Sequence, residues 1–497
     1  MTIRTSFFLS TVLVCAWQAN PQQIPLSGRS AQGGSVNATQ TAVPGTTSSV
    51  NTLNTTVQVQ GPYQGSALSD KPFSGTLGLR GAVERGLEYN LGAVGLNAAL
   101  RQAAGQTRVA RSVLLPNLSA GVRETVQQST LRAMGFRVSL PIPGAAFPSI
   151  VGPFNYFDLR ATLTQKLVDL NALNNYRSAK EVERANMYNA QDARDLVVLA
   201  VGGAYLQVIA SQARVASARV QLETAKALYK QTSDRKQNGL VAQIDVNRSQ
   251  VQQQTQQQRL STLENDLAKQ KINLARLTGL PPNPNYAVSD DVPFAAPPLL
   301  TADEAIARAL VARADLKAAG AQVSSATYLR SAARAERLPS LDVSADYGVI
   351  GTNPAQSHGT FSVTGALRLP IWQGGRIEGD IAQAEAALDL RRAEVQDLRG
   401  KIESDVRSAL LDLEAAASQV ELSKNNQALA RQTVDLTRQR LEAGITDTVE
   451  MVQAQEAVAT SDLDYITSLF AHNLAKLSLA RALGQAAENL DQFLKLR

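Results

Sequence analysis

The sequence predicts a mainly α-helical protein built on long coiled-coil hairpins, together with a membrane β-barrel that several chains must complete. Three observations lead to this fold class. Heptad-spaced apolar residues run through the longest segments, four short segments alternate apolar and polar residues, and the whole plan occurs twice. Composition agrees, since 5% aromatic residues and 4 Met in 497 residues are thin for several globular cores.

The first 19 residues are typical of a secretory signal. Arg4 precedes an apolar run that is too short to span a bilayer, and cleavage is expected near Ala19. The only cysteine, Cys15, lies inside this run, so the mature chain is expected to contain no cysteine. Acylation of Cys15 is the less favoured alternative, because the preceding residue, Val14, is not small.

Residues 20–72 form a Gln-, Ser-, Thr- and Gly-rich segment with almost no charge. Such a composition cannot bury enough apolar surface to fold alone, so the sequence predicts a disordered tail. No later stretch is interpreted as an apolar helix of about 20 residues, the length that crosses a bilayer. If the chain enters a membrane, it is therefore expected to do so as a β-barrel.

The first repeat is expected over residues 73–282. A helical pattern stops at Pro116, and two strands with one apolar and one polar face follow it. A helix of about 65 residues then starts near Leu170 and would be roughly 100 Å long. Two adjacent apolar seams run along this helix, so it needs two neighbours. The turn at Gly239 sends the chain back in a second helix.

A Pro-rich linker over residues 283–298 leads to a second repeat over residues 299–485, and residues 486–497 form a C-terminal tail. The second repeat follows the same plan of helix, two strands and long hairpin. Its turn is expected at Gly444, and the helix that returns from this turn has the cleanest heptad pattern in the chain.

Equivalent residues of the two repeats are separated by fixed numbers of residues. Pro339 lies 223 residues after Pro116, where a helix gives way to a strand in both copies. Gly444 lies 205 residues after Gly239, at the turn of each hairpin. Because the offsets join equivalent points of the plan, they indicate one duplicated unit.

Each copy supplies two strands of about ten residues, the length of a transmembrane β-strand. Four strands cannot close a barrel, so closure needs several chains. If the apolar faces meet lipid, five charged residues point to the barrel lumen, and a lipid-facing Arg would cost about 2–4 kcal/mol at the midplane. These residues are Arg123, Arg160, Asp342, Asp346 and Arg368.

The duplicated plan resembles the TolC-like outer-membrane efflux proteins, or outer membrane factors, over about residues 73–485. Two Leu-Pro-x-Leu helix-to-strand junctions, the segment 370–376 and the hairpin turns 239–245 and 444–450 carry the resemblance. The first copy lacks the family's Gly pair at the corresponding junction, residues 167–171. A different bend is expected there.

The resemblance implies a homotrimer that shares a β-barrel of about twelve strands in outer-membrane lipid, four from each chain, continuous with a periplasmic α-barrel. It also implies that the hairpin tips close the duct and dock a periplasmic adaptor, or membrane fusion protein. The adaptor links the duct to an inner-membrane pump that supplies the energy. No cofactor, metal or enzymatic role is expected.

The resemblance assigns roles to both hairpin turns. Adaptor docking is expected from Gly239, Leu240, Val241, Gly444, Ile445 and Thr446. Acids after the turns are expected to form a gate in the closed tip, namely Asp245, Asp447 and Glu450. The helix dipole alone also favours acids there, by roughly 0.3–1 kcal/mol. The family's basic and aromatic lock residues are replaced by Thr446 and Leu441, so the lock is expected to differ.

The leading functional interpretation is the exit duct of a tripartite efflux pump or a type I secretion system. A stand-alone outer-membrane channel would conduct without partners, and a structural coiled-coil protein would be recovered without detergent. The net charge of +6 is modest and both signs are interspersed, so no nucleic-acid partner is expected. His358 and His472 have no neighbouring His or Cys that would complete a metal site.

Overall fold

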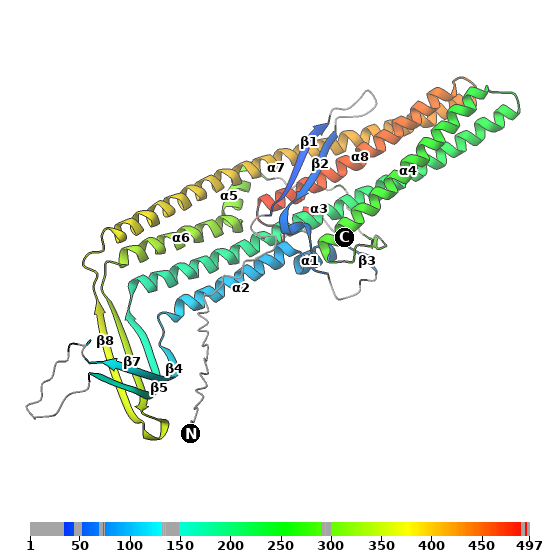
Figure 1. Ribbon diagram of the computed structural model, residues 1–497. Helices are drawn as coiled ribbons and strands as arrows, with labels where there is room; N and C mark the ends of the chain where they lie inside the picture. Colours follow the sequence, from blue (N-terminus) through cyan, green and yellow to red (C-terminus); the bar gives the residue numbers. More distant parts are fainter. Residues whose placement is uncertain are drawn as a thin grey trace, which may run out of the picture.

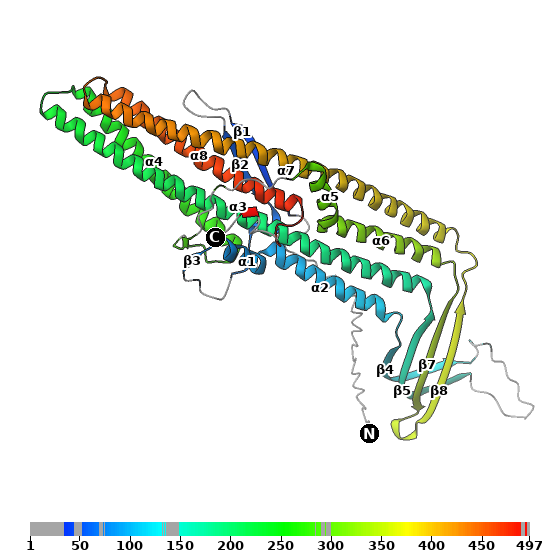
Figure 2. The same ribbon diagram turned by 180° about the vertical axis from the view of Figure 1, so that it is seen from behind.

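The computed structural model describes residues 34–43, 52–68, 73, 75–131, 133, 135, 149–283, 285–289, 294, 300–488 and 493–494. The signal at residues 1–19 lies outside the described residues. The molecule is elongated, with long helices side by side and strands continuing from one end (Figures 1 and 2).

The order of elements repeats, which confirms the mainly α fold with one duplicated plan. The first copy consists of α1 (Leu79–Tyr89), α2 (Leu91–Ser112), β4 (Asn117–Thr130), β5 (Ile150–Val168), α3 (Leu170–Gln237) and α4 (Gln243–Thr278). The second copy consists of α5 (Ala302–Ala312), α6 (Ala314–Ala335), β7 (Ser340–Gly351), β8 (His358–Arg368), α7 (Arg376–Glu442) and α8 (Thr448–Ala482).

The helix expected before each pair of strands is two helices, broken at Asn90 and at Arg313, which lie 223 residues apart. At both positions the backbone leaves the helical region, with ψ of 131° and 125°. Asn90 accepts a hydrogen bond from the N–H of Gly92 at 2.9 Å and so caps α2. Arg313 instead pairs with Asp315 at 2.6 Å. The local contacts of Asn90 and Arg313 therefore accompany a break in the helix, although the apolar pattern continues through both positions.

The long helices form a layer. Helices α3 and α7 run its full length, while α2 and α6 pack beside them near the strands and α4 and α8 do so in the other half. Helix α7 lies along one edge of the layer (Figure 1). The two predicted seams of α3 are confirmed in its middle, where Val197 and Val201 of one seam and Leu206 of the other are buried. Val220, at the end of the second seam, is 67% exposed.

The prediction of a disordered tail is wrong for its described part. Strands β1 (Val36–Val43) and β2 (Thr52–Val59) form an antiparallel hairpin, followed by the short helix η2 (Gly61–Gln64). Val36 and Tyr63 are buried in the same apolar cluster as the middle of α3. The segment lacks the apolar surface to fold alone, but the long helices supply it.

The linker and the C-terminal tail also have ordered parts. Strand β6 (Ala287–Val288), inside the predicted linker, pairs in parallel with β3 (Thr76–Leu77). Ala486 and Leu494, from the predicted tail, are buried in the main apolar cluster. The start of the first repeat, the linker and the chain end therefore meet beside α3.

Within the described residues, α3 holds one stretch that is long and apolar enough to cross a membrane as a helix. The expectation that no such stretch follows the signal is therefore wrong. Inside the molecule 67% of this stretch is buried. Because its surface is covered by neighbouring elements, it has the burial of a core helix.

Asp195 of α3 generates a prediction about pH. Its carboxylate is buried and accepts a hydrogen bond from the N–H of Ala487 at 2.8 Å. Burial raises the pKa of Asp195 from 3.8 to about 6. The folded state therefore binds this proton more tightly than the unfolded chain, and its contribution to stability is lost as pH rises from 3.8 to about 6.

We predict that Asp195→Asn, which keeps an oxygen acceptor for Ala487, raises the free energy of unfolding at neutral pH by roughly 2 kcal/mol. The variant should also flatten the fall in stability across this acidic range. Thermal unfolding followed by circular dichroism at several pH values measures both effects, with Asp389→Asn on the exposed face of α7 as the control. A pH profile equal to that of the unsubstituted protein would contradict the assignment.

Candidate functional site

The two hairpin turns lie at the end of the molecule farthest from the strands (Figure 1) and have the same backbone geometry. Gly239 and Gly444 have φ of 72° and 71°, the left-handed region that glycine adopts without strain. In each turn an N–H bonds a carbonyl five residues earlier at 2.9 Å. This 6→1 bond, with a glycine before the donor, is the Schellman motif that ends a helix.

Each turn exposes one large apolar side chain directly after its glycine. Leu240 is 71% exposed and Ile445 is 69% exposed. Val241 and Thr446, the next residues, are half-buried. Burying an exposed apolar side chain is favourable, because it removes apolar surface from water. Each turn therefore presents one apolar contact point, and the two points lie at equivalent positions.

Asp245 and Glu450 hold equivalent positions after the turns but have different partners. Asp245 accepts a hydrogen bond from the Oγ1 of Thr448 at 2.8 Å, which joins the start of α4 to the start of α8. Glu450 pairs with Arg440 at 2.6 Å and accepts a hydrogen bond from the Thr446 hydroxyl. Both carboxylates are half-buried. The first acid therefore ties two hairpins together, and the second braces its own turn.

Asp447 caps helix α8. Its carboxylate accepts hydrogen bonds from the N–H groups of Val449 and Glu450, each at 3.1 Å. A carboxylate in this position satisfies free N–H groups of the first turn and interacts favourably with the helix dipole. This structural role accounts for the acid, and its predicted place in the gate stays a prediction.

Sequence reasoning missed two contributors to the tip, Arg440 and Thr448, and the packing of a third, Leu441. Arg440 supplies a basic partner for Glu450, and Thr448 supplies the partner of Asp245. Leu441, which replaces the family's aromatic residue, is buried against Leu228 and Met451. The positions of Arg440 and Leu441 at the end of α7 were readable, but their partners depend on how the two hairpins pack.

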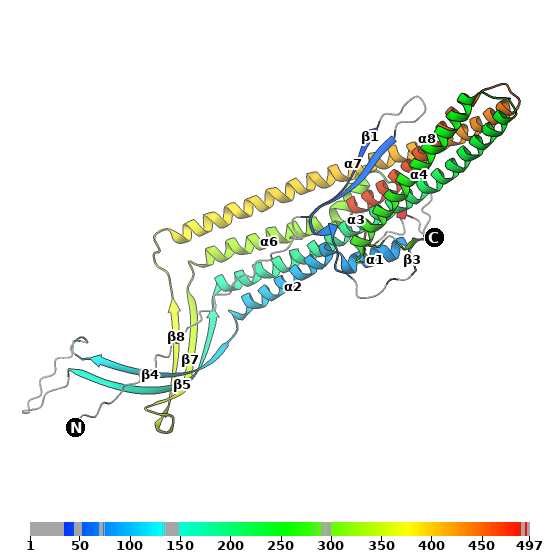
Figure 3. The same ribbon diagram turned by 45° about the vertical axis from the view of Figure 1, so that its right-hand side comes forward.

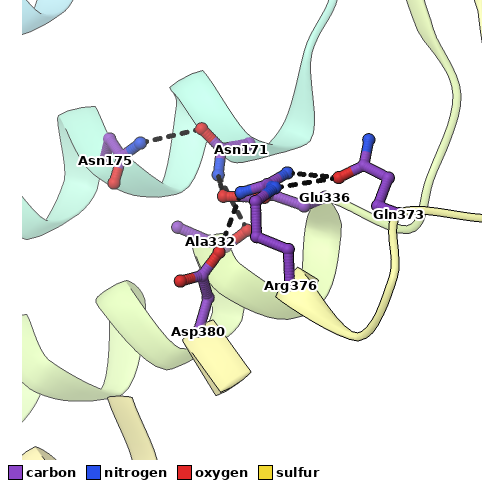
Figure 4. Close-up of polar contacts among 7 residues, drawn as sticks. All are labelled: Asn171, Asn175, Ala332, Glu336, Gln373, Arg376 and Asp380. Carbon is purple, nitrogen blue, oxygen red and sulfur yellow. Dashed lines mark hydrogen bonds and ion pairs between the residues drawn. The ribbon is translucent and has the colours of Figure 1, made fainter. Parts of the chain in front are cut away.

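A polar cluster joins three helix ends where the helices meet the strands (Figure 4). Arg376 of α7 pairs with Glu336, directly after α6, at 2.8 Å. Asn171 of α3 donates hydrogen bonds to the carbonyl of Ala332 at 2.9 Å and to Glu336 at 3.4 Å. Asn171 and Arg376 are equivalent by the 205-residue offset, and both contact one carboxylate. The cluster therefore fixes α3 and α7 on the end of α6.

The two strand-to-helix junctions differ, as expected from the missing Gly pair. In the first copy β5 continues to Val168, and the Asp169 carboxylate caps α3 by accepting a hydrogen bond from Ala172 N–H at 2.8 Å. In the second copy β8 ends at Arg368, and Gly375 precedes α7 with φ of 84°. A capped helix start thus replaces a glycine bend.

Four strands form one antiparallel sheet in the order β4-β5-β7-β8. Directly opposed residues share a face, and the register opposes Arg123 to Asp158 and Asp346 to Thr162. Arg160 pairs with Asp158 at 3.2 Å and also with Asp346. All five residues predicted for the lumen lie on this face by the register: Arg123, Arg160, Asp342, Asp346 and Arg368.

The opposite face of the sheet is apolar and exposed in the single chain. Its exposed side chains include Leu118, Val122, Leu159, Leu163, Tyr347, Phe361, Val363 and Leu367. A face of this kind requires an apolar environment. Across the described ranges, no group of three or more His, Cys, Asp or Glu side chains could hold a metal ion.

Tip, junction and two-faced sheet together define an elongated membrane protein with a helical extension. The sequence profile of the outer membrane efflux protein family matches residues 95–280 and 305–485. The chain belongs to this family. It is an outer-membrane protein that acts as an exit duct in efflux.

Individual relatives agree. The pyoverdine export outer membrane protein OpmQ of Pseudomonas putida is 24% identical over 403 residues, covering 78% of this chain and 81% of that relative. The toluene efflux pump outer membrane protein TtgF of Pseudomonas putida is 25% identical over 77% of this chain and 78% of its own. The outer membrane channel CmeC of Campylobacter jejuni has the same fold, with a TM-score of 0.71, 18% identity, and coverage of 84% and 89%.

Proposed function

We propose that three copies of the chain close into one duct, whose strands share a barrel in the outer membrane and whose hairpin tips dock a periplasmic adaptor. The adaptor joins the duct to an inner-membrane pump, and substrates pass through the duct without energy input of its own. The observation that carries this proposal is the two-faced sheet, which has one exposed apolar face, one charged face and no strand beside β4 or β8 among the described residues.

The helical layer supports closure by several copies in the same way. Helix α7, at the edge of the layer, carries an exposed leucine stripe at heptad spacing: Leu422, Leu429 and Leu436. Helix α4 exposes Ile244 and Val251 at the same spacing. Such stripes are coiled-coil seams that lack a partner within the chain. In a ring of copies, the edge helix of one copy packs on the opposite edge of the next.

The tips support docking through Leu240 and Ile445. Two exposed apolar side chains in identical turns offer six equivalent contact points in a trimer. The adjacent glycines leave open space around them, since a Cβ at Gly239 or Gly444 would meet nothing within 4 Å. A helical hairpin of an adaptor can therefore approach the backbone of each turn.

If the adaptor docks at the tips, residues of the hairpin turns should cross-link to it. A photoreactive benzoylphenylalanine in place of Leu240 or Ile445 should form a covalent product with the adaptor in intact cells, identified by its peptide masses. The same residue in place of Asp397, roughly 70 Å back along α7 from its turn, should not give that product. If the turns label only lipid or other copies of the chain, adaptor docking at the tips is wrong.

The gate is assigned to Asp245 and Glu450, because threefold symmetry would bring six carboxylates to the narrow end of the duct. Like charges at a constriction attract cations and repel anions. Arg440 holds Glu450 by an ion pair, and the Thr448 hydroxyl and Arg248, at 3.7 Å, hold Asp245, so a gate built on these acids has different basic partners from the family's lock at the position of Thr446.

We predict that the trimer reconstituted in planar bilayers has low conductance and prefers cations. The double substitution Asp245→Asn with Glu450→Gln should weaken this preference while helix content is retained. A charge-matched control, Glu394→Gln with Asp397→Asn in the body of α7, should leave the preference unchanged. Equal reversal potentials for the double variant and the unsubstituted protein would remove both acids from the gate.

A further inference from the structure

The β1–β2 hairpin lies outside the part of the chain that the family profile matches, since that match begins at residue 95. One end of the hairpin is fixed to the helical layer. Val36 is buried in the main apolar cluster with residues of α3, and Gln40 donates to the carbonyl of Ala471 in α8 at 3.4 Å. The N–H of Gln60 closes the base of the ribbon by bonding the carbonyl of Ser35 at 2.8 Å. The hairpin therefore has a defined seat on α3 and α8.

Helix α3 is shaped to receive this hairpin. A Cβ at Gly203 would lie 2.6 Å from the Cγ2 of Val57 in β2, so only glycine allows this approach. Ala200 and Ala204 line the same surface beside β2. Glycine in the middle of a helix normally reduces its stability, whereas alanine favours the helix. Here these small residues lower the helix surface beneath the hairpin.

The other end of the hairpin projects past the edge of the layer. In Figures 1 and 3 the ribbon formed by β1 and β2 runs across the layer, and its end away from η2 reaches past helix α7. Apart from this ribbon, no described element lies on the far side of α7 in these views. In a closed ring the position beyond an edge helix belongs to the next copy.

The chemistry of the hairpin suits contact with another polypeptide backbone. Neither strand contains a charged residue or proline, the residues that usually protect a sheet edge from pairing. Its outward face is uncharged and polar, with Asn37 opposite Gln58 and Thr39 opposite Thr56. Among the described residues no third strand pairs with this ribbon, so neither edge has a strand partner within the chain.

We infer that the β1–β2 hairpin is a strap between copies: its base is seated on α3 and α8 of one copy, and its projecting end lies on the next copy of the same chain. The strap crosses the boundary at α7, midway along the helical barrel. This inference depends on the proposed trimer. Within that trimer the strap is a contact between copies that is separate from the β-barrel and from the helix seams.

Photo-cross-linking of the full chain in outer membranes tests the strap. Benzoylphenylalanine at Val43, the last residue of β1, should give covalent dimers and trimers of the chain. The same residue at Gln58, near the seated base, should give products within one copy only. Products within one copy at both positions, or a product with a different protein at Val43, would overturn the strap.

Displacement of the hairpin provides a second measurement. Gly203→Leu forces Val57 away from α3 and should reduce the dimer yield from position 43 and lower the temperature at which detergent-solubilised trimers dissociate. The matched control is Gly320→Leu in α6, where a Cβ would meet nothing within 4 Å. If the unsubstituted protein forms no trimer, the proposed function fails. If trimers persist without a cross-link from position 43, only the strap fails.

Discussion

Unpaired backbone groups at the edge of a membrane sheet are the constraint on which the rest of the structure depends. Lipid offers no hydrogen-bond partner, and each unsatisfied N–H or C=O group costs several kcal/mol there. The four strands of this chain leave β4 and β8 at the two ends of their sheet. The proposed closure by further copies would remove both edges at once, and it would arrange the helices that continue from the strands in a ring.

The long helices follow from that closure. Each strand joins a helix at the same end of the sheet, so a ring of strands becomes a ring of helices. The cluster around Glu336 fixes α3 and α7 at this joint, and the two helices then run about 100 Å to the tips. Their length sets the distance between the sheet and the turns that are proposed to dock the adaptor. The exposed apolar stripes on α7 and α4 likewise need helices of neighbouring copies to cover them.

Most of the fold could be predicted because periodicity is a local property of the sequence. The seams of α3, the alternation around Val122 and Leu159 and the turns at Gly239 and Gly444 each follow from residues close together in the chain. The break at Asn90 could not be predicted in this way, since its capping bond competes with an unbroken apolar pattern. The β1–β2 hairpin was missed because its stability comes from Gly203 and its neighbours, far away in the sequence.

The same distinction between local patterns and packing applies to the candidate site. The turn glycines were identified from the 205-residue offset, and the apolar residues that follow them from the resemblance to the family, and neither step needs packing information. The partners of the acids were not identified, because Arg440 and Thr448 reach Glu450 and Asp245 only when the hairpins are packed. Asp447 was grouped with the gate on position alone, whereas its bonds to two N–H groups give it a role in starting α8.

The most direct test of the central claim is the mass of the purified protein in mild detergent, measured by native mass spectrometry after the detergent is removed in the gas phase. Because one chain leaves both sheet edges and both helix edges open, the account predicts a single species of three mature chains. A stable species of one chain, or one that remains soluble without detergent, would contradict it.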